Sequence, residues 1–222
     1  MPDVIREIKK SHITNYHRGK SWEHCYAFFR NHKKFHNNEN LLDTSALHLG
    51  FFLASWGMLR GSSFLLQKDY KFYVPIVETL TDSKYDRLWS VNFLDESGES
   101  KDRDIDLLFQ LIDDLRENIN KNNLSDGDNE KHETNLLITK IIMSTMGCVP
   151  AYDRFFKDGL KQKTKKTNNF NKKSFKHLLN LVVMDNELKK EFKKSCFIQG
   201  TNIEYPPMKL LDLYFWLLGA EK

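Results

Sequence analysis

A lysine and an aspartate lie on either side of a break in an apolar stretch of the chain. Lys140 belongs to the run 136–146, which is expected to be a buried helix, and Gly-Cys-Val-Pro at 147–150 interrupts it. Proline holds the preceding residue extended and ends that helix, so the next helix is expected to begin near Asp153. An aspartate there is either only an N-cap, which stabilises a helix by about 1 kcal/mol, or the acid that a reaction needs.

Aromatic and cationic side chains surround this aspartate in the sequence. Tyr152 and Arg154 flank Asp153, so a stacking ring, an acid and a cation are expected at one helix start. Eight lysines follow directly between residues 157 and 176 and would hold phosphates beside such a site. We therefore expect Asp153 to be catalytic and Tyr152 and Arg154 to contact nucleic acid.

A lysine-containing helix, a proline and then an aspartate that opens the next helix resemble the core of the helix-hairpin-helix DNA glycosylase superfamily. The resemblance covers about twenty of the 222 residues. It implies that Asp153 assists departure of a damaged or modified base from DNA, in repair or in defence against phage, and that Lys140 is the nucleophile. The pattern departs from the superfamily before Lys140, where the glycine signature of the hairpin is missing, and the Lys140–Asp153 separation is shorter than usual.

The chemistry of base removal explains why such residues would be needed. Breaking an N-glycosidic bond builds positive charge on the sugar, which a fixed carboxylate stabilises. The base must also leave the stack and enter a pocket with aromatic or apolar walls. Trp22, Trp56 and Tyr152 are candidates for these walls, although such residues more often belong to the apolar core.

A second polar cluster interrupts the most apolar part of the chain. The stretch 54–63 reads ASWGMLRGSS and contains Trp56 and Arg60. Gly57 and Gly61 each cost a helix about 1 kcal/mol relative to alanine, so close packing or the approach of a ligand is expected there. Arg60 would suit a phosphate, and the alternative is a close-packed kink with a salt-bridged arginine.

Charge is distributed unevenly, although the net charge is only +4. Residues 101–135 carry ten acids against five Lys/Arg, whereas 157–176 carry eight lysines and one acid. Such a basic block favours a polyanion, so DNA is the expected partner, and Lys163, Lys165 and Lys166 are expected to contact its phosphates. The alternative is a pair of solvated charged faces.

Two other functions remain open. Arg30 and His36 have the Arg-Asn-x4-His spacing of the HEPN ribonucleases, which are all-α and cut RNA without metal. Two further Arg/His pairs in the chain share this spacing, and short motifs of this kind also arise by chance. The third possibility is a helical module that binds nucleic acid or protein without catalysis.

The apolar pattern predicts an all-α protein. Ile105, Leu108, Ile112, Leu115 and Ile119 follow the spacing of an amphipathic helix, and similar stripes recur along the chain. We expect seven to nine helices in a single globular domain, 1–222. Two lobes are conceivable, with a seam in the acidic loop near 123–130.

Composition indicates a folded protein of the cytoplasm. The chain is 40% hydrophobic and 29% charged, its first residues lack an apolar signal segment, and no run of eighteen apolar residues occurs. Its three cysteines are widely separated, so neither a disulfide framework nor a zinc site is expected. No metal, no cofactor and no membrane contact are expected, and the oligomeric state is left open.

Overall fold

The protein is built from helices packed around a continuous apolar core. The computed structural model describes residues 2–32, 39–94, 101–124, 134–165 and 169–221. This part of the chain contains ten α-helices, three 3-10 helices and no strand, apart from an isolated bridge between Phe197 and Glu204. The all-α class is therefore confirmed, and the helices outnumber the seven to nine expected.

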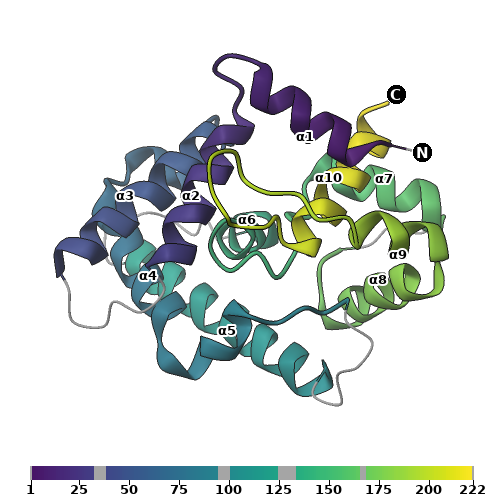
Figure 1. The fold of residues 1–222 in the computed structure, drawn as a ribbon. Coiled ribbons are helices and arrows are strands. Elements are labelled where there is room, and N and C mark those ends of the chain that lie inside the picture. Colours follow the sequence, from purple (N-terminus) through teal and green to yellow (C-terminus); the bar gives the residue numbers. More distant parts are fainter. Residues whose placement is uncertain (1, 33–38, 95–100, 125–133, 166–168, 222) are drawn as a thin grey trace.

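The helices follow one another in a simple order along the chain (Figure 1). From the N-terminus these are α1 (Val4–Ile13), α2 (Gly19–Asn31), α3 (Glu39–Ser55), η1 (Phe64–Gln67), η2 (Tyr70–Tyr73), α4 (Val74–Thr81), η3 (Ser83–Trp89) and α5 (Lys101–Leu124). They are followed by α6 (Asn135–Thr145), α7 (Arg154–Thr164), α8 (Lys172–Met184), α9 (Asn186–Phe192) and α10 (Pro207–Ala220).

Two of these helices are not evident from hydrophobic spacing, and side-chain caps define where they begin. Asp3 caps α1, and its carboxylate accepts the N–H of Arg6 at 2.9 Å. Asp185 ends α8 and at once caps α9, accepting the N–H groups of Glu187 and Leu188 at 3.1 Å each. One residue, Asp185, therefore ends one helix and begins the next.

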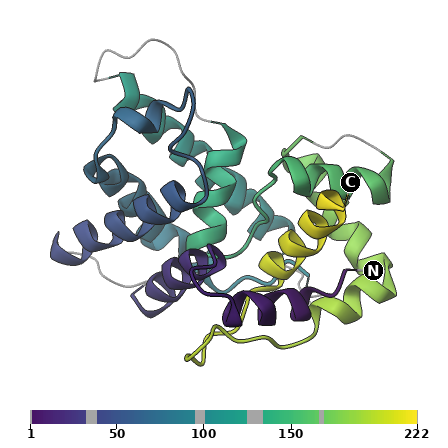
Figure 2. The same cartoon turned by 90° about the horizontal axis from the view of Figure 1, so that it is seen from above.

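In space the helices form two groups (Figure 2). One group contains α2 to α6, and the other contains α1 together with α7 to α10. Within the described residues the chain passes between the groups at 14–18 and again at 146–153. Residues 125–130 of the expected seam lie outside the described part, and the helices before and after the seam, α5 and α6, belong to the same group.

The closest helix contact in the second group is the crossing of α7 and α10. A Cβ added to Gly159 would lie 1.9 Å from the carbonyl oxygen of Phe215, and one added to Gly219 would lie 2.0 Å from that of Phe155. Neither position has room for a methyl group. Reciprocal glycines thus allow the two backbones to touch and fix α7 against α10.

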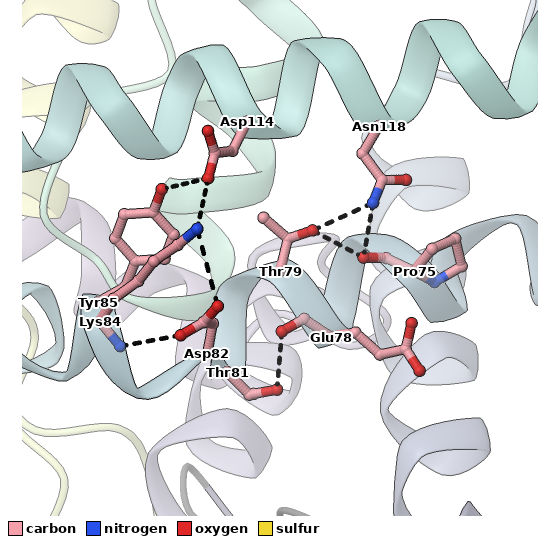
Figure 3. A network of polar contacts seen from close by, with 9 residues as sticks. All are labelled: Pro75, Glu78, Thr79, Thr81, Asp82, Lys84, Tyr85, Asp114 and Asn118. Carbon is pink, nitrogen blue, oxygen red and sulfur yellow. Dashed lines mark hydrogen bonds and ion pairs between the residues drawn. The ribbon is translucent and has the colours of Figure 1, made fainter.

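A polar network holds α4 and η3 against α5 in the first group (Figure 3). Lys84 Nζ and the Tyr85 hydroxyl donate to Asp114 Oδ2, at 2.7 and 2.6 Å. One turn further along α5, Asn118 Nδ2 donates to the Thr79 hydroxyl at 3.2 Å. The Lys84 and Tyr85 hydrogen bonds lower the pKa of the Asp114 carboxyl.

None of the helices in the described part of the chain combines the length and the apolar character needed to cross a bilayer.

Candidate functional site

The break after α6 redirects the chain from one group of helices into the other. Gly147 has a φ of +71°, and its N–H donates to the Ile142 carbonyl at 2.9 Å. A Cβ at Gly147 would lie 2.6 Å from Pro206 and 2.7 Å from the ring of Tyr26. Only glycine meets both the backbone and the packing requirement, so the break expected from the sequence depends on Gly147 as well as on Pro150.

Ala151, the first residue after the proline, connects α6 to α10 through hydrogen bonds of its backbone. Its carbonyl accepts the hydroxyl of Thr139 on α6 at 2.7 Å. Its N–H donates to Asp212 Oδ1 on α10 at 2.9 Å. The break therefore places a backbone donor against a buried carboxylate.

Asp153 is the N-cap of α7, as expected. Its Oδ1 accepts the N–H of Phe156 at 2.9 Å, which leaves Oδ2 outside the cap. Burial raises the pKa of Asp153, and the nearby charge of Asp212 raises it further. The hydrogen bond from Phe156 and the charges of Lys140 and Lys209 oppose this rise in pKa. Asp153 thus lies in electrostatic reach of three charged groups.

Lys140 is buried, with 6% of its surface exposed. Its Nζ donates to the carbonyl oxygen of Trp56 at 2.8 Å. Burial lowers the pKa of Lys140, and the charges of Asp153 and Asp212 oppose that effect. The two residues singled out by the sequence are therefore electrostatically coupled, since each is among the causes of the other's pKa shift.

The cluster contains a second pair that sequence reasoning missed. On α10, Lys209 Nζ donates to Asp212 Oδ2 at 2.9 Å, and the two residues are only 5% and 3% exposed. The Lys209 Nζ also lies 4.6 Å from the ring of Trp56 and 5.2 Å from that of Trp22. An opposite-charge pair three residues apart within the apolar run of α10 was the signal that could have revealed it.

A cavity of about 150 Å³ lies beside this pair. Trp22, Trp56 and Trp216 contribute its aromatic wall together with Tyr205, and Lys209 and Asp212 line it as well. The other lining residues are Glu7, Ile8, Ser11, His17, Arg18, Gly19 and Leu213. Lys140 and Asp153 are not among the lining residues.

Trp56, an expected contact to nucleic acid, is held at the cavity by several cations. Its Nε1 donates to the Arg18 carbonyl at 3.3 Å, and the Arg18 guanidinium lies 5.4 Å from its ring. The Lys140 Nζ lies 5.9 Å from the same ring. Trp22 is more deeply placed, because its Nε1 donates to the Met143 carbonyl and only 1% of it is exposed.

Tyr152 and Arg154, which flank Asp153, have different surroundings. Tyr152 is 3% exposed, and its ring packs against Phe156 and Phe170 with centroids 4.8 and 4.7 Å apart. The expected contact of Tyr152 with nucleic acid is thus replaced by a place in the core. Arg154 is exposed, and its guanidinium lies 3.9 Å from Asp158 on the same helix.

Arg60 lies apart from the charged cluster. It is exposed and borders a separate hollow of about 480 Å³ that Ser62, Ser63 and Thr134 also line. Gly57 and Gly61 have φ values of +73° and +61°, and no heavy atom lies within 4 Å of a Cβ built on Gly61. Backbone conformation, rather than close packing, explains the glycine at position 61.

Three lysines of the basic stretch form ion pairs with acids in the folded protein. Lys163 bonds to Asp185 at 2.8 Å, and Lys176 to Asp102 on α5 at 2.6 Å. Lys172 likewise pairs with Asp106 on α5. Lys165 is an exposed C-cap of α7 with a φ of +58°, and the expected contact at Lys166 lies outside the described residues. The acidic and basic blocks of the sequence thus partly neutralise each other.

The ribonuclease motif is only partly described. Arg30 donates from Nη1 to the carbonyl oxygen of Trp89, and its guanidinium lies 5.9 Å from the ring of Tyr26. Both contacts are with the packed interior of the first helix group. His36 lies outside the described residues.

The described residues contain no group of three or more His, Cys, Asp or Glu side chains placed to hold a metal ion. Comparison of the chain with protein-family models, with curated proteins and with solved structures gives no match. The geometry of the charged cluster and its cavity is therefore the basis for any assignment of function.

Proposed function

We propose that the protein is a DNA glycosylase-like enzyme in which Asp153 assists cleavage of the bond between a base and its sugar. One observation carries this proposal. Lys140 and the half-buried Asp153 are electrostatically coupled to Lys209 and Asp212, the buried pair that lines a cavity walled by tryptophan. Perturbed titratable groups next to an aromatic cavity are typical of active sites.

The cavity has the size and the walls for a single aromatic ring. A volume of about 150 Å³ is comparable to that of an engineered protein cavity that binds benzene. Tryptophan faces stack on planar rings whatever their substituents. An extruded base would therefore enter beside Trp56 and Trp216, with the polar pair of α10 at its edge.

Asp153 has the properties that stabilisation of a cationic sugar requires. The Phe156 N–H fixes one carboxylate oxygen, so the group is oriented before substrate arrives. Partial burial makes its charge more effective than it would be in water. Lys140 is the amine that the superfamily resemblance implicates, and its lowered pKa increases the fraction of neutral amine.

Replacement of Asp153 by asparagine tests the proposal, because asparagine caps a helix as well as aspartate does. Purified protein is incubated with duplex and single-stranded DNAs that carry oxidised, alkylated, deaminated or phage-type modified bases. Heating in alkali then cuts any abasic site. Wild-type protein should produce strand breaks, and Asp153→Asn should reduce them by about 10²-fold or more.

Asp158→Asn is the matched control, since it removes an acid from the same helix without touching the cluster. It should leave strand cleavage unchanged. The proposal fails if wild-type protein makes none of these DNAs alkali-labile, or if Asp153→Asn is as active as Asp158→Asn.

A further inference from the structure

The hollow beside Arg60 lies where the chain leaves α3 and where it enters α6. Its volume is about 480 Å³, whereas the tryptophan cavity measures about 150 Å³, and the two share no lining residue. Pockets that bind small molecules usually measure about 300–1,000 Å³. The hollow is therefore large enough for a ligand of its own, apart from the charged cluster.

Two kinds of side chain line this hollow. The apolar ones are Met58, Phe64, Leu65, Leu136 and Leu137. The polar ones are Arg60, Ser62, Ser63 and Thr134, and Gly57 completes the set. Within the described part of the chain, the lining thus carries one cation, no acid and a substantial apolar surface.

Two of the hydroxyls can still donate, because their oxygens already accept hydrogen bonds from the backbone. Ser63 accepts the N–H of Leu65, and Thr134 accepts the N–H of Leu137, at 3.3 Å each. A hydroxyl used in this way keeps its own proton for another partner. Together with the N–H groups of the Arg60 guanidinium, these hydroxyls make the polar lining rich in donors, which suits an anion.

Gly57 leaves room for the guanidinium of Arg60. It has a φ of +73°, and a Cβ built on it would lie 3.2 Å from Arg60 Nε and 3.3 Å from Arg60 Cζ. The arginine side chain therefore folds back over Gly57, which itself lines the hollow. The glycine that follows α3 thus helps to place the cation at the hollow.

We infer that this hollow binds a small monocarboxylate with an apolar body, such as a medium-chain fatty acid. The planar guanidinium of Arg60 matches the two oxygens of a carboxylate. The one positive charge among the described lining residues balances a monoanion, and the apolar residues cover the rest of the ligand. The inference goes beyond the proposed function and does not rest on it, because the ligand lies outside the tryptophan cavity.

Isothermal titration calorimetry of the full-length protein with octanoate tests the inference. Octanoate should bind at one site, and octanol, which has the same chain length without the charge, should bind at least about tenfold more weakly. From hexanoate to decanoate, each buried methylene should tighten binding by up to about fourfold. No octanoate binding, equal affinity for octanol, or an affinity that does not depend on chain length would overturn the inference.

Substitution of Arg60 locates the site. Arg60→Gln, at an exposed position, should weaken octanoate binding about tenfold or more, while its circular dichroism spectrum and melting temperature stay near those of the wild type. Arg60→Lys keeps the charge but loses the planar fork, so its affinity should lie between the two. Lys71→Gln removes an exposed cation of η2 and should bind octanoate like the wild type. Equal affinities of Arg60→Gln and Lys71→Gln would place octanoate elsewhere and overturn the inference.

Competition with DNA distinguishes a ligand site from a contact to the DNA backbone. A phosphodiester is also a monoanion, and the sequence suggested a phosphate for Arg60. A short duplex, added in excess over the protein, should leave the affinity of the wild type for octanoate unchanged. Displacement of octanoate by the duplex would assign Arg60 to a DNA phosphate and overturn the inference.

Discussion

At the scale of single residues, Asp153 combines a helix cap with a partly buried charge. Alanine at position 153 removes the cap and should lower the free energy of unfolding by about 1 kcal/mol, whereas asparagine keeps it and should change stability by less than about 0.5 kcal/mol. Urea unfolding at pH 7 measures both. Equal losses in the two variants would show that the charge itself stabilises the fold.

Because the pKa of Asp153 is raised, the difference in stability between the wild type and Asp153→Asn should depend on pH. Between the ordinary and the raised pKa the folded state binds more protons than the unfolded state, so stability falls as pH rises across that interval. Asp153→Asn cannot titrate and should lack this fall. A difference between variant and wild type that does not change with pH would contradict the assignment.

Asp114 should show the opposite sign. Its pKa is lowered by Lys84 and Tyr85, so its contribution to stability is present above the ordinary aspartate pKa and is lost as pH falls through the lowered value. Asp114→Asn should therefore destabilise the protein at pH 7 and progressively less toward pH 3. Asp113→Asn is the control, because that carboxylate is exposed and pairs with its helix neighbour Arg116 rather than with Lys84. Denaturant unfolding across this pH range checks the slope.

At the scale of elements, the crossing of α7 and α10 reverses the usual effect of replacing a helical glycine by alanine. Alanine in place of a helical glycine normally adds about 1 kcal/mol of stability. At Gly159 or Gly219 the new methyl group would meet a backbone oxygen, so each change should instead cost about 2 kcal/mol or more. Thermal and urea unfolding measure the loss. Lys161→Ala, at an exposed position of α7, should stay within about 0.5 kcal/mol, and a stabilising Gly159→Ala would refute the crossing.

The elements also show what the sequence could and could not predict. Proline, an acid three residues later and an apolar run were sufficient to place the end of α6 and the cap of α7. The start of α1 and the division of α8 from α9 each depend on a single capping acid, which the spacing of apolar residues does not reveal. Lys209 and Asp212 could have been found as an opposite-charge pair within an apolar run, but their proximity to Trp22 and Trp56 depends on how α10 packs and is not visible in the sequence.

At the scale of the whole molecule, the fold brings lysines of the basic block next to acids of the acidic block. The sequence suggested a basic face, yet Lys172 and Lys176 are matched by acids of α5. If DNA binds this face, the contribution must come from lysines such as Lys161 and Lys165, which are exposed. Paired lysines would first have to break their ion pairs with the acids of α5. The free energy of that step reduces what a phosphate contact contributes to binding.

This difference is measurable by the salt dependence of DNA binding. Lys161→Glu with Lys165→Glu should weaken binding and reduce the slope of log K against log salt by roughly one unit per lost phosphate contact. Lys172→Gln with Lys176→Gln should change the slope by less. Equal effects of the two double variants, or no binding at low salt, would exclude this face as the DNA contact.

The pairing of α1 with α10 has a consequence for the order in which the chain is made. The ribosome releases α1, α2 and α3 long before α10. Trp22 and Trp56 are therefore synthesised well before the α10 residues that line the same cavity. The first helix group can form early from its own neighbours in sequence. The Lys209–Asp212 pair arrives afterwards, so the lining of the cavity is complete only when translation has passed α10.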